Sequence, residues 1–321
     1  MASWQEITTE MDQEIRSAGP GGIDNVRRQK LDALFQITKR PVLLYGVEMF
    51  NLAKINATQG DISIDLKDKD GFVEALRGIE GKGIDVIIHS PGGSPEATES
   101  IVELLRKRFD SIRFIIPSIA KSAATMLAMS GDEIILGNDA ELGPTDPQMI
   151  INGVANPAHC ILKQFDLAKQ EIAKNNKNLP AWLPIIQQYG PSLLVSCKNA
   201  MDLTKKLVAK WLAMYMLKGQ VKAKNKAAII SRYLAGDHLS HSRPIDISAL
   251  KKKGVKIKYA SELTPDLSDA ILDIHYALSM TFERTGAYKI YENHLGKGFY
   301  RVIQVIMPTM PQPPQGRIPK S

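Results

Sequence analysis

The stretch that decides the fold is residues 84–148, which read IDVIIHSPGGSPEATESIVELLRKRFDSIRFIIPSIAKSAATMLAMSGDEIILGNDAELGPTDPQ. Two apolar runs, 84–89 and 112–117, each end in a turn, and a segment with helical spacing at 95–108 separates them. Short apolar runs bounded by turn residues predict strands that are buried on both faces. Strands that alternate with helices predict a parallel sheet, so we expect an α/β fold with helices covering the sheet.

The pattern continues on both sides of this stretch. Further strands are predicted at 41–47, 61–66, 133–136 and 255–257, and the alternation at 61–66 is typical of an exposed strand or hairpin arm. Helices are predicted at 3–17, 24–37, 68–79, 122–130, 157–174, 190–217, 222–234, 246–253 and 265–283. We expect an N-terminal helical arm at 1–38, a main domain at 39–300 with a helical insertion at about 157–234, and a proline-rich basic tail at 301–321, extended or disordered.

The composition is that of a globular protein with a sizeable core. Of the 321 residues, 44% are hydrophobic and 23% are charged, and the formal net charge is +7. Many lysines stand in short helical runs such as 205–206 and 251–253, which are typical of solvated helix faces. No basic motif with interleaved aromatic residues occurs, so no specific nucleic-acid binding is predicted.

The two cysteines and the N-terminus bear on the compartment and on metal binding. Cys160 and Cys197 form no CxxC motif and no Cys/His cluster, so we expect no zinc site, no disulfide and no cofactor. The first residues are acidic and amphipathic, unlike a signal peptide, and no run of about 18 apolar residues occurs. We therefore expect no membrane span and a cytoplasmic location.

Ser122 is the candidate nucleophile. It follows a predicted strand and begins the helix whose next residues are small, Ala123-Ala124. A serine hydroxyl becomes nucleophilic when a base removes its proton and N–H donors stabilise the oxyanion, and the start of a helix offers such donors. The alternative is a plain helix N-cap, a position that serine often occupies.

The glycine pair Gly92-Gly93 follows the preceding strand. Glycines allow backbone conformations that can turn an N–H toward a ligand, although a tight turn without any ligand would also need them. The carboxyl ends of adjacent parallel strands meet at the sheet edge where open α/β sheets bind ligands. The glycine pair and Ser122 together therefore predict a site for serine-based acyl transfer.

Three motifs carry a family resemblance: SPGG at 90–93, AKSAA at 120–124 and LGPTDPQ at 142–148. Together they resemble the Clp/crotonase superfamily, above all the SDH-type (serine dehydrogenase proteinase) group of Clp-fold serine peptidases, which is related to the SppA signal peptide peptidases. Segments 244–245 and 285–294 also resemble later parts of that group, so the resemblance covers about residues 40–300. It implies a Clp/crotonase-like ββα spiral core and a serine endopeptidase that hydrolyses peptide bonds through an acyl-enzyme.

The resemblance also implies roles for single residues. Ser122 would be the nucleophile, and the N–H groups of Gly93 (or Gly92) and Ala123 would form the oxyanion hole. ClpP carries a histidine shortly after the strand that follows its serine helix, whereas this chain has Gly-Pro-Thr-Asp at 143–146. That difference argues against a ClpP-style Ser-His-Asp triad.

The SppA branch uses a lysine as the base, some tens of residues after the serine. Lys163 is similarly placed, 163 − 122 = 41 residues after Ser122, and Ile161, Leu162 and Phe165 are its apolar neighbours. A lysine in apolar surroundings loses its charge more easily and can act as a base near neutral pH. We therefore expect Lys163 to form a Ser-Lys dyad with Ser122, the alternative being a lysine on the helix surface.

Five other residues are weaker candidates. Lys169 lies on a different helix face from the predicted base, and Lys121 is expected to contact solvent or a charged substrate. His241 precedes a helix that resembles the segment carrying the acid in ClpP, so it either orients a group near the site or is a loop histidine. Asp146 is expected to hold the LGPTDPQ loop through backbone N–H groups, and His89 to pack locally.

Two rival functions stay open at this point. Crotonase-like binding or hydrolysis of acyl-CoA would use the same oxyanion hole, and a basic protein would suit the CoA phosphates. A non-catalytic scaffold would have Ser122 buried and Lys163 in solvent. The resemblance implies a peptide or protein substrate and a homo-oligomer, with contacts through residues 1–37 and the helices after 157. The chain contains no P-loop, so an ATPase partner would be a separate chain.

Overall fold

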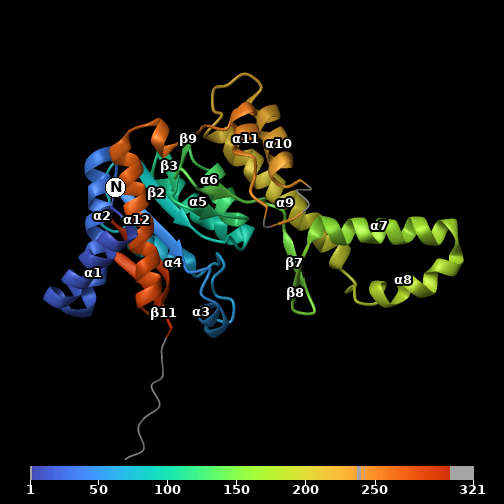
Figure 1. Ribbon diagram of the computed structural model, residues 1–321. Coiled ribbons are helices and arrows are strands. Elements are labelled where there is room, and N and C mark those ends of the chain that lie inside the picture. Colours follow the sequence, from blue (N-terminus) through green and yellow to red (C-terminus); the bar gives the residue numbers. More distant parts are fainter. Residues whose placement is uncertain (1, 237–239, 242, 304–321) are drawn as a thin grey trace, which may run out of the picture.

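The computed structural model describes residues 2–236, 240–241 and 243–303, so all but the first three residues of the expected tail at 301–321 lie outside the described part. It is a mixed α/β fold around one large sheet (Figure 1). The expected α/β class with a mostly parallel sheet is confirmed. Among the described residues, no helix combines the length and the apolar character needed to cross a bilayer.

Seven strands form the central sheet, in the order β11-β10-β1-β2-β3-β5-β9. Their bounds are β1 Val42–Val47, β2 Gly83–His89, β3 Ser111–Ile116, β5 Glu133–Leu136, β9 Ile257–Tyr259, β10 Ala287–Asn293 and β11 Gly298–Val302. The pairs from β1 through β9 are parallel, whereas β10 runs antiparallel to both β1 and β11. The parallel strands are buried on both faces, as their near-continuous apolar sequences predict.

Different helices cover the two faces because side chains alternate along each strand. Leu43 and Val86 point to one face, into the core shared with α4, α5, α6, α9, α10 and α11. Leu44 and Ile87 point to the other face, which α2 and α12 cover side by side (Figure 1). The bounds are α2 Gly22–Thr38, α4 Asp68–Ala75, α5 Pro95–Arg108, α6 Ala123–Met129, α9 Leu193–Met214, α10 Ala223–Leu234, α11 Ile247–Lys252 and α12 Pro265–Arg284.

The N-terminal helix α1, Trp4–Ala18, packs against α2 and α12 through Ile7 and Met11. Ser3 caps its first turn: its hydroxyl accepts the Glu6 N–H, and the Glu6 carboxylate accepts the Ser3 N–H. A reciprocal cap of this kind satisfies two N–H groups that have no acceptor within the helix. Helices α1 and α2 correspond to the two helices that were predicted at 3–17 and 24–37.

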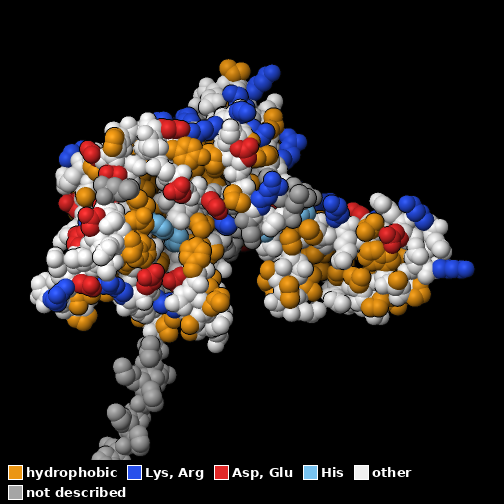
Figure 2. Space-filling view, viewed as in Figure 1, with side chains coloured by type: hydrophobic (Ala, Val, Ile, Leu, Met, Phe, Trp, Pro, Cys, Tyr) orange, Lys and Arg blue, Asp and Glu red, His pale blue; other side chains and the backbone are white. Residues whose placement is uncertain are grey.

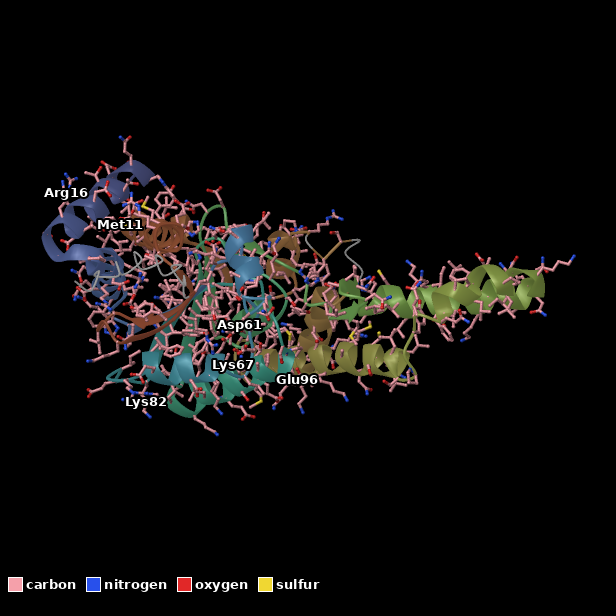
Figure 3. All side chains as sticks on the ribbon, turned by 90° about the horizontal axis from the view of Figure 1, so that it is seen from below. Met11, Arg16, Asp61, Lys67, Lys82 and Glu96 are labelled. Carbon is pink, nitrogen blue, oxygen red and sulfur yellow. The ribbon has the colours of Figure 1, made fainter. Side chains whose placement is uncertain are left out.

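A helical arm, distinct from the N-terminal helices α1 and α2, extends away from the body, as Figures 1 and 3 show from two directions. It consists of α7, Ala158–Lys174, a short helix α8, Leu179–Ile186, and the first part of α9. The hairpin of β7, Gln148–Ile151, and β8, Val154–Pro157, lies at its base. Ala158, Ile161 and Cys197 form a small core within the arm.

Two parts of the chain differ from the sequence expectation. Residues 61–66 do not form a strand; they contribute a single parallel bridge, between Ile64 and Gly93. Residues 287–302 form the β10–β11 hairpin, for which no strands were predicted. Lys289 and Glu292 of β10 are completely buried as ion pairs, so this inner strand lacks the apolar run that marks the others.

The remaining elements are short. They are α3 Leu52–Ala57, the strand pair β4 Ile119–Ala120 and β6 Glu141–Leu142, and the 3₁₀ turns Gly19–Gly21, Asn176–Asn178 and Ala260–Glu262. The β4–β6 pair is parallel, and it holds the residues before Ser122 beside the loop that begins at Leu142. This small second sheet brings two of the three sequence motifs together.

Candidate active site

Ser122 stands at a strained turn between β4 and α6. Its backbone angles are φ 52° and ψ −122°, a region that residues with a side chain rarely adopt. Such a conformation costs about 1–3 kcal/mol and persists only when the surroundings enforce it. Here the Ser122 N–H donates to the Pro144 carbonyl at 3.1 Å. A strained strand-to-helix turn is also how hydrolases of another fold present a nucleophilic serine.

The Gly92 backbone lies directly against this turn. A Cβ on Gly92 would be 2.7 Å from the Ser122 Cβ and 2.8 Å from the Ala123 nitrogen, and Gly92 itself has φ +97°. Gly93 approaches the backbone of Ile64 just as closely. Only glycines therefore fit at these two positions, because of close contact with neighbouring backbone.

The N–H groups around Ser122 differ in whether they already have acceptors. The Gly92 N–H donates to the Ser90 hydroxyl at 3.2 Å, and the Ser122 N–H is bound to Pro144. Within the part of the chain that the structure describes, the N–H groups of Gly93 and Ala123 have no acceptor. Two N–H donors beside the serine are therefore available for a bound oxygen atom.

A cavity of about 590 Å³ opens in front of Ser122. Its polar wall contains the Gly92-Gly93 turn, Glu96, Gln148 and His241, and its apolar wall contains Ile62, Met126, Ile150, Ala200 and Leu203. The hairpin β7–β8 and helix α9 supply the side that faces the arm. The volume and the mixed lining are typical of a site for a small molecule or a side chain.

His241 lies in this cavity with a carboxylate behind it. The Asp146 Oδ1 atom is 2.8 Å from the His241 Nδ1 atom, and the Asp146 side chain is only 4% exposed. Gln148 donates to the other carboxylate oxygen at 3.0 Å. The Gln148 Nε2 atom is also 3.0 Å from His241 Nδ1, so that atom can either donate to Asp146 or accept from Gln148. In the tautomer that donates to the carboxylate, Nε2 is the acceptor nitrogen.

The lysines of the sequence interpretation lie elsewhere. Lys163 is exposed on α7 and does not line the cavity. Lys169 is exposed on the same helix, near Asp166. The Lys121 Nζ atom lies 3.7 Å from the carboxylate of Glu141. The Ser-Lys dyad stays a prediction, and the structure places His241, with Asp146 beside it, and not Lys163, at the cavity.

A buried polar cluster supports the 61–66 segment that contacts Gly93. Lys289 donates to the Asp68 carboxylate and to the Ser63 carbonyl, both at 2.8 Å, and neither the Lys289 nor the Asp68 side chain is exposed. The hydroxyls of Tyr45 and Tyr291 also donate to Asp68. Burial and the nearby Asp68 charge raise the pKa of both tyrosines, so they stay protonated and keep donating.

The sequence interpretation missed three contributions to the site. It assigned no role to Gln148 or Ile64, and it considered His241 only as an orienting group. The one sequence signal for His241 was its place just before Pro244-Ile245, a segment that already resembled the peptidase group. Its pairing with Asp146, 95 residues earlier, appears only in the fold.

The mixed α/β fold, with its parallel-rich sheet and a serine turn beside a glycine pair, is that of ClpP-like proteins. Residues 61–265, more than half of the chain, match the family of ClpP-like SDH-type serine proteinases. The chain belongs to this family, and the resemblance drawn from the three motifs is confirmed.

Two relatives found by sequence are described as uncharacterized proteins. One protein of Methanocaldococcus jannaschii is 27% identical over 196 residues, which is 60% of this chain and 59% of the relative. Another from the same organism is 27% identical over 195 residues, 60% of each chain. The chain thus matches about three fifths of the length of these curated relatives.

Among solved structures, a mutant of the membrane-bound stomatin-specific protease 1510-N is similar in part. The match has 16% sequence identity and a TM-score of 0.32, and it covers 63% of this chain and 93% of that chain.

Proposed function

We propose that this protein is a serine peptidase that cleaves peptide bonds through an acyl-enzyme on Ser122, with His241 as general base. The main observation in support is that Ser122, at its strained turn, and His241, which contacts the buried Asp146, line the same cavity. Family membership supports the broader statement, a serine proteinase. The choice of base rests on the chemistry of the cavity.

The proposed reaction follows from these positions. His241 Nε2 takes the hydroxyl proton as Ser122 Oγ attacks the carbonyl carbon of the scissile peptide bond. The N–H groups of Gly93 and Ala123 stabilise the resulting oxyanion, and Asp146 stabilises the imidazolium. The imidazolium then protonates the leaving amine, and the acyl-enzyme forms. Water, deprotonated by His241, hydrolyses the ester in the same way.

The cavity wall suggests which peptides bind. Ile62, Met126, Ile150 and Leu203 offer an apolar surface beside the serine. A substrate side chain that enters the cavity gains by burying apolar area, so we expect a preference for an apolar residue next to the cleaved bond. Comparing cleavage of peptides with leucine and with aspartate at that position tests this expectation.

The rival functions explain less of the geometry. Acyl-CoA chemistry on an oxyanion hole needs no nucleophile, so it leaves the strain at Ser122 without a role. A scaffold predicts a buried Ser122 and an exposed Lys163; Lys163 is exposed, but Ser122 is half-buried and lines the cavity. We therefore favour the peptidase.

A fluorophosphonate probe, which reacts with activated serines, tests the assignment in four proteins: the unmodified chain, Ser122→Ala, His241→Ala and Lys163→Ala. We expect no labelling of Ser122→Ala, and a labelling rate at least about 100-fold lower for His241→Ala, since a general base contributes that much. Lys163→Ala serves as the matched control and keeps its rate within a factor of about three. Labelling of Ser122→Ala rejects the nucleophile, and a loss confined to Lys163→Ala restores the lysine as base.

We also propose that the protein works as a homo-oligomer, as the family resemblance implies. The helical arm supports this because Leu179 and Leu183 of α8 are 40% and 44% exposed, and Val195 of α9 is 63% exposed. Exposed apolar side chains that gather on one projection often mark a protein contact. Sedimentation equilibrium decides the question, and a monomer at 100 μM, roughly the upper end of useful concentrations, rejects the proposal.

A further inference from the structure

A second cavity, of about 380 Å³, lies on the side of the sheet that α12 covers. Glu48 follows β1, His89 ends β2 and Ser118 follows β3, so the cavity stands at the carboxyl ends of three parallel strands. Its outer wall is α12, with His275 and Glu283. Among the residues that the structure describes, none lines both this cavity and the one in front of Ser122. The position is one where α/β sheets commonly bind ligands.

His89 lines this cavity and is a buried polar group. It is 3% exposed, and within the described residues the Nδ1 atoms of His89 and His275 have no hydrogen-bond partner. The two rings lie 5.4 Å apart between centroids. Burial, and secondarily the neighbouring His275, lowers the pKa of His89 to about 3, so it is neutral near pH 7. Buried polar atoms are normally satisfied, so these two unpartnered nitrogens single out the histidine pair in the wall of this cavity.

The charge of the lining is negative. Glu48 and Glu283 line the cavity, and among the described residues no lysine or arginine does. The Glu48 side chain accepts the N–H groups of Phe50 and Asn51 at 2.8 Å and 3.1 Å, which fixes one oxygen and the direction of the carboxylate. Lys54 does not line the cavity; its ammonium donates to the carbonyls of Phe282, a lining residue, and Ala287, and its charge attracts Glu48. An anionic ligand would thus meet two carboxylates, with the nearest cation engaged by backbone carbonyls and Glu48.

Aromatic rings flank the acidic groups. Phe50 is 65% exposed and lies 6.1 Å from the His89 ring, and Trp4 is 41% exposed and packs edge-on against Tyr276. Figure 2 shows histidine atoms in pale blue between red acidic and orange hydrophobic side chains, next to the place of α12 in Figure 1. Exposed aromatic faces attract organic cations.

The donor set does not suit a metal ion. Among residues 2–236, 240–241 and 243–303, no three histidine, cysteine, aspartate or glutamate side chains are close enough to coordinate one metal. An organic cation needs hydrogen-bond acceptors, negative charge and apolar surface, and the cavity has all three. Its volume is within the range of small-ligand sites.

We propose that this cavity binds a small organic cation, a primary ammonium group carried on an apolar body. The ammonium would donate to Glu48 and to the neutral imidazole of His89, and the apolar part would pack on Phe50 and Trp4. A free amine and a lysine side chain share this chemistry. The proposal does not depend on the peptidase proposal, since the two cavities are separate.

The test is a titration of the full chain followed by NMR of the histidine side chains, with each signal assigned by single substitution. The ligands are benzylamine, Nα-acetyl-lysine methylamide, and benzyl alcohol as the uncharged control. We expect a saturable shift of the His89 and His275 signals with one or both amines, and none with the alcohol. The amine that binds identifies the source, a free amine or a lysine side chain.

Two variants and a control locate the binding. Glu48→Gln keeps an acceptor for the two backbone N–H groups but removes the charge, and we expect it to weaken amine binding at least about tenfold. Phe50→Ala changes an exposed ring, keeps the fold, and should weaken binding severalfold. Glu103→Gln, on the exposed face of α5, should leave the affinity unchanged. The proposal is overturned if neither amine binds, if benzyl alcohol binds equally well, or if both cavity variants keep the original affinity.

Discussion

Gly92→Ala is the substitution that most directly tests the geometry at Ser122, the proposed nucleophile. The added methyl group would lie 2.7 Å from the Ser122 Cβ and 2.8 Å from the Ala123 nitrogen, and the Lys121 carbonyl oxygen would be closer still. Ordinary contact begins at 3.4 Å, so relative to the added methyl group the Lys121 carbonyl oxygen, 2.4 Å away, must move by 3.4 − 2.4 = 1.0 Å. All three neighbours belong to the turn that holds the serine.

The expected losses in rate and in stability follow from this displacement. A shift approaching 1 Å between reacting groups costs on the order of 100-fold in rate, so we expect the fluorophosphonate labelling rate of Ser122 to fall about 100-fold. The left-handed φ of +97° adds a strain of about 1 kcal/mol for alanine, and the clash adds about 1–3 kcal/mol. The free energy of unfolding should therefore fall by about 2–4 kcal/mol.

Gly81→Ala is the matched control. Gly81 has nearly the same backbone angle, φ +100°, but nothing lies within 4 Å of the position of its Cβ. It should therefore lose about 1 kcal/mol through strain alone and keep its labelling rate. Urea denaturation gives the stabilities, and labelling under native conditions gives the rates.

Labelling of folded Gly92→Ala at a rate within about threefold of that of the unmodified protein would contradict this prediction, because the turn would then tolerate the displacement. Equal stability losses in the two variants would also count against it, since they would leave the contact with Ser122 and Ala123 without an energetic effect.

Three further predictions concern the charged and titratable groups. Asp146→Asn should lower kcat by about 10³–10⁴-fold with little change in KM, because the amide no longer fixes the His241 tautomer; an unchanged kcat would remove Asp146 from the mechanism. Lys289→Met should cost about 3–5 kcal/mol in urea denaturation, since it leaves a buried carboxylate without its cation, whereas Arg77→Met at an exposed pair should cost less than about 1 kcal/mol. Similar losses in these two variants would contradict that account. His89 has a folded pKa of about 3 against an ordinary 6.5, so between these values the unfolded chain takes up a proton that the folded chain excludes. Stability should thus fall as the pH is lowered from 6.5 toward 3, by up to about 1.4 kcal/mol per pH unit from this residue, and His89→Phe should lose less stability between pH 7 and pH 5. A variant with an equal loss would show that other groups cause the acid dependence.

The parts of the fold that the sequence predicted correctly are those in which local pattern and tertiary environment agree. The runs at 84–89 and 112–117 are apolar because parallel strands are covered on both faces, and the structure has β2 and β3 there. The order of the glycine pair and Ser122 on successive strands placed both at one sheet edge. They do lie in contact there.

The parts that were not predicted depend on partners far away in the chain. The alternation at 61–66 is typical of a strand, but this segment makes only one bridge and is held by Lys289, more than 220 residues later. The polar residues of β10 pair inside the core, so the strand has no apolar period. His241 becomes a candidate base only through Asp146, and spacing along the chain gave no sign of that contact.

The strained backbone of Ser122 determines which residue at this position gives the more stable fold. Glycine adopts positive φ without the steric penalty of a side chain, so replacing Ser122 by glycine would relieve part of a strain of about 1–3 kcal/mol. If Ser122 is the nucleophile, as proposed, the inactive glycine variant would then be the more stable protein. At this position, stability alone favours glycine, whereas the proposed reaction requires the serine hydroxyl. A serine that is kept here is therefore kept for its hydroxyl and not for stability.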